Sequence, residues 1–308
     1  MDIDLITNVL YAMVRTGTPL LIVALGELVC ERSGVLNLGQ EGMMLMGAVV
    51  GFIVTLTTGS LMLGFMLAIV AGMLMSMLFA AIALGLNANQ VATGLALTIF
   101  GTGLSAFIGA AYVGTPIVGL EPIAIPYLSD IPLIGKMLFA QDLVVYLSFG
   151  LFGLVYWFFK SSRLGLTVKA VGENPHAANS LGLPVMRTRY LAVAFGGGMA
   201  GLAGGYLSLA YTPLWAENMT AGRGWIALAL VVFATWRADR IIFGAYLFGL
   251  ASILNLVVQG LGYPVSPNLL AMMPYAATVL VLVMISSNVM KSKMYTPMWL
   301  GKPFHPHS

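Results

Sequence analysis

Long apolar runs follow one another along almost the whole chain and are separated by short polar stretches. Each run is continuous rather than alternating, and a helix needs about 20 apolar residues to cross a bilayer. The pattern predicts an all-α polytopic membrane protein with one transmembrane domain over residues 1–308 and about nine transmembrane helices (8–10). These spans are expected near 10–29, 39–58, 61–85, 91–112, 142–160, 190–211, 224–236, 241–261 and 269–288.

Two of these spans depart from a simple apolar run. The 224–236 span is short, and the 10–29 span contains Arg15, Gly17 and Pro19. The first part of the 10–29 span could therefore be an amphipathic helix that lies at the membrane interface. The start "MDIDLITN" is acidic and lacks the basic region of a cleavable signal peptide, so we expect the first apolar segment to be retained.

Composition narrows the class of protein. The chain is 59% hydrophobic and 8% charged, whereas soluble domains carry about 25% charged residues. The single Cys30 excludes an internal disulfide and a Cys-rich metal site. The three histidines, His176, His305 and His307, lie outside the predicted spans, and no nucleophile–base pair or metal-ligand cluster is evident. We therefore expect neither an enzyme nor a metal centre, and the sequence has no phosphate-binding loop of its own.

Lysine and arginine residues predict the orientation. One set of connections contains Arg32, Lys160, Arg163, Lys169, Arg187, Arg189, Arg237, Arg240, Lys291, Lys293 and Lys302, and the other set contains only Arg15, Lys136 and Arg223. The positive-inside rule places the richer set in the cytoplasm. The N-terminus is then outside and the C-terminus cytoplasmic, which agrees with an odd number of spans. The outer 113–141 connection includes an amphipathic stretch expected to lie on the membrane surface.

The stretch "AVGENPHAANSLGLP" (170–184) is polar within an apolar chain. Asn174 can cap a helix, Pro175 suits the first helical position, and Gly182 suits the position after the last turn. These signals predict a helix of two turns, about 10 Å long. Such a helix is too short to persist alone in water. It either packs on its own membrane domain as an ordinary loop or provides a contact surface for a partner.

Polar residues also gather in two clusters that lead directly into apolar runs. "CERSGVLNLGQEG" contains Glu27, Glu31, Asn37, Gln40 and Glu41, and "WAENMTAGRG" contains Glu217, Asn218, Thr220 and Arg223. Under the predicted topology the first cluster enters its span from inside and the second from outside. That arrangement is typical of an inverted repeat with a transport path at the repeat interface.

The candidate path residues have a second interpretation. Gln40 and Glu41 could simply begin a helix, Glu31 could pair with Arg32, and Asn89 could cap the 91–112 span. Asn255 and Gln259, four residues apart, could face the path or link helices. Amide side chains suit a neutral hydroxylated solute better than a cation. The predicted substrate path is Asn37, Gln40, Glu41, Asn89, Gln90, Glu217, Asn218 and Arg223.

Several motifs resemble a known transporter family. "NPHAANSLG" resembles the coupling helix of ABC importer permeases, whose motif is Glu-Ala-Ala, three residues, then Gly; Ala177, Ala178 and Gly182 keep that spacing. His176 replaces the Glu, so the ion-pairing role of that Glu cannot be carried over. Residues 26–48, 88–97, 165–183 and 217–236 resemble the branched-chain amino acid, ribose and nucleoside permease family, and look most like nucleoside permeases that use basic-membrane-protein-type binding lipoproteins.

The resemblance implies an inverted-repeat ABC importer permease fold in a prokaryotic cytoplasmic (inner) membrane. It implies a separate cytoplasmic ABC ATPase that binds the ATP, so no cofactor is expected on this chain. It also implies a second permease subunit, a paralogue in the family's nucleoside systems, and an extracytoplasmic substrate-binding lipoprotein; no nucleic acid is expected. The cytoplasmic coupling loop would be 161–189, with helix 175–182 on the ATPase. The coupling residues would be Glu173, Asn174, Pro175, His176, Ala177, Ala178 and Gly182.

The expected cargo is a nucleoside, with ribose or another simple sugar as the alternative. A secondary transporter would explain the polar clusters equally well but not the capped helix in a basic loop. Dependence of uptake on ATP separates these classes. If the 175–182 helix couples to an ATPase, a bulky charged residue in place of Ala178 is expected to abolish uptake without preventing membrane insertion.

Overall fold

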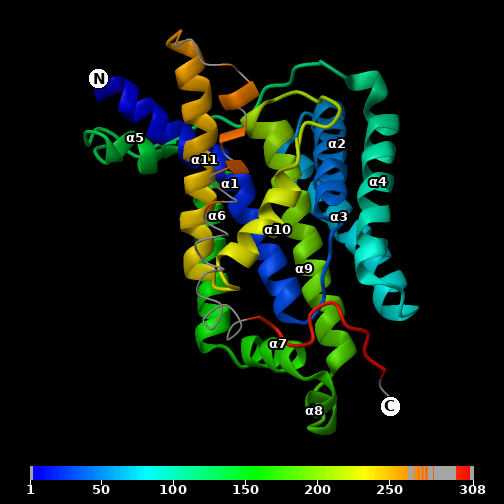
Figure 1. The fold of residues 1–308 in the computed structure, drawn as a ribbon. Coiled ribbons are helices and arrows are strands. Elements are labelled where there is room, and N and C mark those ends of the chain that lie inside the picture. The colour runs from blue at the N-terminus through cyan, green and yellow to red at the C-terminus, as the bar shows by residue number, and fades with distance from the viewer. Residues whose placement is uncertain are drawn as a thin grey trace.

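The computed structural model describes residues 3–262 and 296–305, together with positions 266, 268–270, 272, 273, 275, 276 and 280 between them. Its main body is a bundle of long helices (Figure 1). Within the described residues, seven helices are long and apolar enough to cross a membrane. They are α1 (Ile3–Arg32), α2 (Gln40–Thr58), α3 (Leu61–Ala80), α4 (Gln90–Gly109), α6 (Leu143–Ser161), α9 (Val185–Tyr206) and α11 (Ala238–Gly260).

Short irregular turns extend three of these helices. A π-helical turn, Ala81–Gly85, prolongs α3, and another, Leu207–Tyr211, prolongs α9. A 3₁₀ turn, Ala110–Tyr112, prolongs α4. With these extensions the seven helices agree with seven of the predicted spans, because a long apolar run has few alternatives to a spanning helix.

The remaining two predicted spans have different outcomes. The 224–236 span corresponds to α10 (Arg223–Phe233), which has 11 residues. At 1.5 Å per residue α10 is about 16 Å long, so it cannot cross a bilayer of about 30 Å alone. The 269–288 span falls largely outside the described residues. The first span is one continuous helix, α1, that runs through Pro19 and includes the part predicted as a possible separate interfacial helix.

Helix α9 forms the centre of the bundle and packs against α1, α2 and α3. Its sequence "FGGGMAGLAGGY" places glycines where neighbouring backbones approach closely. A Cβ atom at Gly201 would overlap the carbonyl oxygen of Ala68 on α3, and one at Gly204 would overlap that of Met44 on α2. Small residues therefore allow three helices to meet backbone to backbone, as in other membrane bundles.

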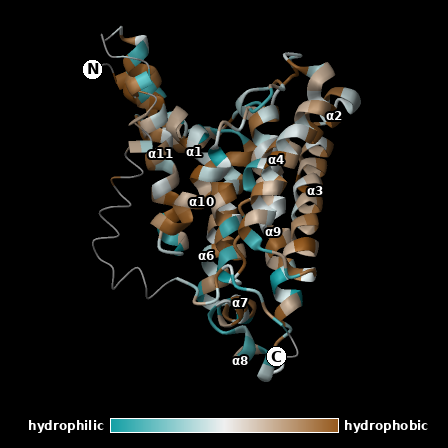
Figure 2. Cartoon of the chain, turned by 45° about the vertical axis from the view of Figure 1, so that its right-hand side comes forward, coloured by the Kyte–Doolittle hydropathy of each residue, from teal (hydrophilic) through white to brown (hydrophobic). Residues whose placement is uncertain are grey.

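The outer faces of α3 and α4 are apolar and exposed. Met62, Leu74, Ile99 and Phe107 are between 65% and 82% exposed. Figure 2 shows that hydrophobic residues cover much of the long helices, whereas hydrophilic residues lie mainly at the two ends of the bundle and at a few places inside it. This distribution fits helices whose outer faces contact lipid or another membrane subunit.

The two ends of the bundle differ. At one end, called the α7–α8 end below, two short helices lie beyond the long ones: α7 (Arg163–Glu173) and α8 (Pro175–Ser180). At the opposite end lie the N-terminus, helix α5 (Ile134–Phe139), and the two-residue strands β1 (Ile123–Ala124) and β2 (Ala140–Gln141), which pair antiparallel. The segment 296–305 returns to the α7–α8 end (Figure 1).

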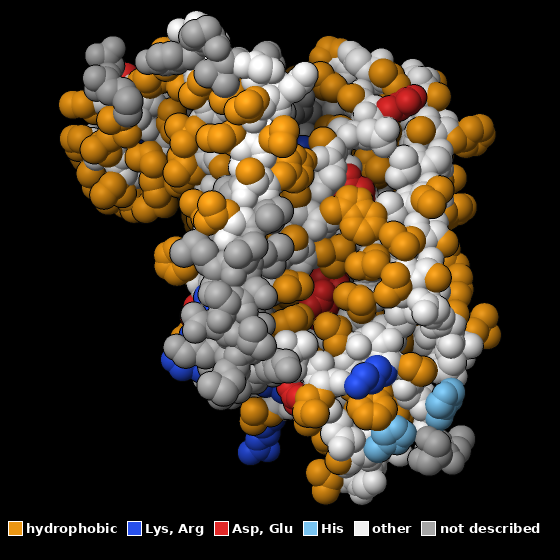
Figure 3. Space-filling model, in the orientation of Figure 1, with side chains coloured by type: hydrophobic (Ala, Val, Ile, Leu, Met, Phe, Trp, Pro, Cys, Tyr) orange, Lys and Arg blue, Asp and Glu red, His pale blue; other side chains and the backbone are white. Residues whose placement is uncertain are grey.

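Charge follows the same division. On the face drawn in Figure 3, lysine, arginine and histidine side chains gather chiefly at the α7–α8 end. The N-terminus and the segment 296–305 lie at opposite ends of the bundle (Figure 1), an arrangement that agrees with the predicted topology. The assignment of the α7–α8 end to the cytoplasm stays a prediction from the positive-inside rule.

Candidate functional site

Helix α8 is capped at both ends by the residues that the sequence indicated. The Asn174 side chain accepts a hydrogen bond from the backbone N–H of Ala177 at 3.0 Å, and Pro175 occupies the first turn. After the last turn Gly182 has φ +78°, a conformation that glycine adopts without strain. The N–H groups of Gly182 and Leu183 donate to the carbonyls of Asn179 (2.9 Å) and Ala178 (3.0 Å). This pair of bonds is a Schellman motif, so α8 ends where the sequence predicted.

The two faces of α8 differ in exposure. Ala178 is 3% exposed and packs in a small cluster with Val171, Val185 and Phe304. Ala177 is exposed, and Leu181, just after the helix, is 81% exposed. A bulky charged residue at Ala178 would disturb this internal cluster, so that substitution cannot isolate an effect on coupling. Only the face with Ala177 and Leu181 is open to a partner.

A strap made of residues 296–305 holds α7 and α8 against the bundle. The backbone N–H of Trp299 donates to the Gly172 carbonyl at 3.0 Å, and that of Gly301 donates to the Gly34 carbonyl at 3.0 Å. The His176 ring contacts the rings of Trp299 and Phe304, with centroids 5.2 Å apart in both pairs. The positive-inside rule predicts that this segment lies on the cytoplasmic side, but no sequence signal indicates that it contacts the candidate coupling helix. The contacts fix the position of α8 relative to α1 and α7.

The first polar cluster is buried inside the bundle. The Glu27 carboxylate on α1 accepts a hydrogen bond from the Gln40 side-chain amide and one from the backbone N–H of Asn37, the latter at 3.4 Å. All three residues are fully buried. The Asn37 side chain in turn accepts from the backbone N–H of Gly39 at 2.9 Å. The cluster therefore closes the connection between α1 and α2. Figure 1 shows this connection returning from the α7–α8 end, so that α2 begins inside the bundle.

Glu31 and Arg32, at the end of α1, both contact Trp236. The Glu31 carboxylate accepts a hydrogen bond from the Trp236 indole N–H, and the Arg32 guanidinium donates to the Trp236 carbonyl at 2.6 and 3.1 Å. The sequence suggested a pair between Glu31 and Arg32. In the structure both side chains instead form hydrogen bonds with Trp236. These bonds link the end of α1 to the connection between α10 and α11.

Glu41 brings the two polar clusters together. Its carboxylate accepts hydrogen bonds from the Thr220 hydroxyl and from the backbone N–H groups of Gly222 (2.8 Å) and Gly224 (2.7 Å). Glu41 lies in the first turn of α2, and Gly224 lies in the first turn of α10. Two helix N-termini, each with a positive dipole end, thus meet at one carboxylate. Short helices that begin inside a membrane bundle are typical of transporter binding sites.

The other predicted path residues have separate places. Asn89 caps α4 by accepting from the backbone N–H of Ala92 at 2.9 Å, and Gln90 accepts from the backbone N–H of Leu36 at 2.9 Å. Glu217 and Asn218 are exposed in the connection before α10. The structure therefore unites Asn37 and Gln40 with Glu27, and Glu41 with Thr220, and leaves Asn89 as a capping residue.

Arg223 lines a pocket of about 250 Å³ between α1, α10 and α11. Thr16, Ser252 and Asn255 add hydroxyl and amide groups to its wall. An aromatic pair, Phe248 and Tyr275, also lines it, with ring centroids 6.1 Å apart. Asn255 accepts a hydrogen bond from the Gln259 amide at 2.6 Å, so these two residues contact each other on one helix. The pocket combines polar groups and aromatic rings, as sites for small ligands commonly do.

A third polar group was missed by sequence analysis. Arg15 on α1 lies with its Nε 3.5 Å from Asp142 Oδ2 and donates to the Ala210 carbonyl at 2.7 Å. The Tyr206 hydroxyl donates to Asp142 Oδ2 at 3.2 Å. An arginine within an apolar run and an aspartate just before another run were the available signals. Asp142 also caps α6, so the ion pair joins α1, α6 and α9.

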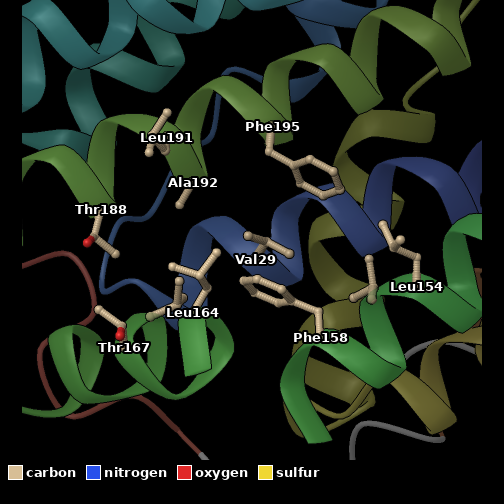
Figure 4. Close-up of a pocket in the computed structure, with 11 residues that line it drawn as sticks. Val29, Leu154, Phe158, Leu164, Thr167, Thr188, Leu191, Ala192 and Phe195 are labelled. Carbon is tan, nitrogen blue, oxygen red and sulfur yellow. The ribbon is translucent and has the colours of Figure 1, made fainter. Parts of the chain in front are cut away.

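A second pocket, of about 310 Å³, lies between α1, α6, α7 and α9 (Figure 4). Its labelled side chains are mostly apolar: Val29, Phe158, Leu164 and Phe195 face one another, and Thr167 stands at the edge. A neutral polar solute would find few hydrogen-bonding partners here, so the pocket is a poor candidate for a transport path.

Comparison with known sequences decides the family. Residues 9–286 match the family described as the permease component of branched-chain amino acid transport systems. The chain belongs to this permease family.

Curated members of the permease family are similar over most of their length. A putative glucose ABC transporter permease protein of Haloferax volcanii is 45% identical over 265 residues, which cover 85% of this chain and 80% of that protein. A guanosine ABC transporter permease protein of Bacillus subtilis is 33% identical over 300 residues, covering 92% and 93% of the two chains. A nucleoside ABC transporter permease protein of Lactococcus lactis is 28% identical over 296 residues, covering 91% and 93%. No solved structure matches this permease.

Substitution of Glu41 by Ala is expected to destabilise this permease. Three donors, on Thr220, Gly222 and Gly224, would lose a buried charged acceptor, which costs about 3 kcal/mol or more of the free energy of unfolding. Glu41→Gln keeps a neutral acceptor and should lose roughly half as much. The thermal unfolding midpoint in detergent measures both changes. Glu217→Ala removes an exposed carboxylate and is the control; equal midpoints for Glu41→Ala and Glu217→Ala would contradict a structural role for Glu41.

Proposed function

We propose that this chain is the transmembrane subunit of an ATP-driven ABC importer and that α8 transmits the action of a separate ATPase subunit. One observation carries the proposal: α8 is a two-turn helix capped at both ends and held by the strap 296–305, with one face left exposed. A helix of this length needs external support in water. Its caps, its buried Ala178 and the strap supply that support and present Ala177 and Leu181 outward.

The orientation and the other subunits of the transporter follow from the same proposal. The α7–α8 end faces the cytoplasm of a prokaryotic cell, and the N-terminus faces outward, where an extracytoplasmic substrate-binding protein delivers the cargo. ATP binds to the partner ATPase, so this chain needs no cofactor and has no enzymatic activity. A second permease subunit, a paralogue or an identical copy, contacts this chain in the membrane.

The proposed cargo is a neutral, hydroxyl-rich solute of the nucleoside or monosaccharide class. The pocket with Arg223, Ser252 and Asn255 supports this class, because guanidinium, hydroxyl and amide groups all form hydrogen bonds with hydroxyls, and the Phe248 and Tyr275 rings suit the apolar face of a sugar or base. The motifs suggest a nucleoside. The higher identity to a glucose permease than to nucleoside permeases makes glucose an equal candidate.

At the Glu41 junction, one helix from each half of the chain contributes to the proposed path. Helix α2 begins inside the bundle, and α10 begins beside it, so each half contributes a helix that starts part-way across. Movement of one half against the other would open the path to one side at a time. Glu41 itself accepts three hydrogen bonds and therefore acts as a structural link, not as a group that binds cargo.

Uptake into proteoliposomes tests the proposal. The vesicles contain this chain, its partner permease, the ATPase and the binding protein, and receive labelled glucose, ribose, uridine or adenosine with and without internal ATP. Uptake of one solute is expected to rise at least about tenfold with ATP, since coupling supplies a large free energy. Preference for nucleosides or for a sugar would decide the cargo. Uptake indifferent to ATP would overturn the proposal and indicate a secondary transporter.

A further inference from the structure

A positively charged pocket of about 460 Å³ opens at the α7–α8 end, where α1 and α6 end and α11 begins. It lies apart from the pocket that contains Arg223 and from the Glu41 junction, and shares no lining residue with either. Four of its lining residues are cationic and one is acidic; they are Arg32, Lys160, Lys169, Arg237 and Asp239. These residues carry three more positive than negative charges, which favours an anionic occupant.

The two lysines of the pocket contact neutral groups, so these contacts do not cancel their charge. The Lys169 Nζ donates to the Phe159 carbonyl at 2.7 Å, and the Lys160 Nζ contacts the Tyr156 hydroxyl at 3.3 Å. Both acceptors are neutral. Burial, together with the nearby Arg32 guanidinium, lowers the pKa of Lys169. A bound anion would relieve this repulsion between like charges.

One ion pair occurs within the pocket wall. The Arg237 Nη2 lies 2.7 Å from Asp239 Oδ2, and both side chains are 38% exposed. An exposed pair of this kind contributes little to stability. Asp239 lies next to one of the four cations, and an anion placed between Lys160 and Lys169 meets the positive charge of both lysines.

The pocket has the surroundings of a membrane surface. Tyr156, near the end of α6, and Trp236, in the connection between α10 and α11, line it, and amphipathic aromatic rings are enriched at membrane–water interfaces. From Asp239, an exposed apolar stripe follows α11 at intervals of four residues towards the middle of the bundle: Phe243 is 76% exposed and Leu247 is 51% exposed. A molecule with an anionic headgroup and apolar tails would fit the cationic pocket and the apolar stripe beside it.

We propose that this pocket binds the phosphate headgroup of an anionic phospholipid, with its acyl chains along the Phe243–Leu247 stripe of α11. Basic pockets between transmembrane helices bind such headgroups in other membrane proteins. The phosphate is the group recognised by the cations, and the stripe favours a lipid over a soluble phosphate. A bound headgroup would connect α1, α6, α7 and α11, and so would hold α7 in place beside the candidate coupling helix. The proposal does not depend on the cargo or on the ATPase.

The test uses the purified, delipidated full chain in detergent. Phosphatidylglycerol, phosphatidylcholine with the same acyl chains, and soluble glycerol phosphate are titrated separately, and bound ligand is measured by native mass spectrometry and by the thermal midpoint. The variant K160Q/R237Q removes two cations from the pocket. The control R187Q/K302Q removes two exposed cations from the same end of the molecule and leaves the pocket unchanged.

Phosphatidylglycerol is expected to bind wild type and the control equally well, and to bind K160Q/R237Q at least about tenfold more weakly. If K160Q/R237Q does not fold, the single variant K160Q at an exposed lysine should still weaken binding about fivefold. Equal binding of phosphatidylcholine, or an equal loss in both double variants, would overturn the proposed site. Binding of glycerol phosphate as tight as that of phosphatidylglycerol would overturn the lipid and indicate a soluble phosphate.

Discussion

Replacing Leu181 by Asp is expected to abolish ATP-dependent uptake and the association of the chain with its ATPase, while the folded permease remains. Leu181 is 81% exposed at the end of α8, so the new carboxylate stays in water and costs the isolated chain little. Against a partner surface the same carboxylate would be desolvated without a partner charge, which weakens binding by roughly 2–5 kcal/mol, or at least about 30-fold. Co-purification of the ATPase with the tagged permease measures the loss.

A matched control exists at the opposite end of the bundle. Val118 is 83% exposed and belongs to the connection between α4 and β1, which Figure 1 shows at the end away from α8, so Val118→Asp introduces the same group at an equally exposed apolar position. This variant should retain the ATPase. Ala178→Asp is not a suitable substitute, because Ala178 is buried against Phe304. Retention of the ATPase by Leu181→Asp at the wild-type level would remove α8 from the proposed contact.

Substitution of Gly201 by Leu should prevent the bundle from forming. The new side chain would have to occupy the position of the Ala68 carbonyl on α3, and Gly47 on α2 already faces the Gly201 backbone on the other side. Neither obstacle is a flexible side chain, so the helices must separate. Overpacking of a core commonly costs 1–3 kcal/mol, and displacement of backbones from two helices should exceed about 3 kcal/mol. Size-exclusion chromatography in detergent and the thermal midpoint report the outcome.

Gly103 on α4 provides the comparison for Gly201. A Cβ there meets nothing within 4 Å, although Gly103 also lies within a long apolar helix. Gly103→Leu should therefore give a monodisperse protein with a midpoint close to that of wild type. A similar midpoint for Gly201→Leu would mean that α2, α3 and α9 are not packed backbone to backbone. Gly201→Ala should give an intermediate loss, because a single methyl group still overlaps the Ala68 carbonyl.

The features that sequence analysis predicted correctly are those with local causes. Seven of the nine predicted spans correspond to long apolar helices among the described residues, since each of these runs by itself is long enough to span a bilayer. The ends of α8 were predicted because Asn174 and Gly182 act on backbone groups within five residues of themselves. Helix α7 was not predicted, although the Ser162 side chain caps it in the same way, by accepting a hydrogen bond from the backbone N–H of Gly165 at 2.9 Å.

The polar site was predicted only in outline. The idea of an inverted repeat indicated that the two polar clusters belong together, and Glu41 does contact the second cluster. Its partners there are the Thr220 hydroxyl and two backbone N–H groups, whereas Glu217 and Asn218, chosen for their polar side chains, are exposed. Because every residue except proline carries a backbone N–H group, such donors cannot be recognised from residue type. The ion pair between Arg15 and Asp142 was missed for a related reason, since nothing local joins the first span to the start of α6.

The strap 296–305 has a consequence for the order of events during synthesis. Met298 contacts Glu173 across 125 positions of the chain, and the Phe304 ring completes the cluster around Ala178. While the ribosome is still translating α9 to α11, α8 lacks this support and exposes the apolar groups that the strap later covers. The surface proposed to contact the ATPase is thus completed only after the membrane helices before the strap have been made. Only chains in which the strap has been translated would then assemble with the ATPase. Incomplete permeases would remain without an ATPase subunit.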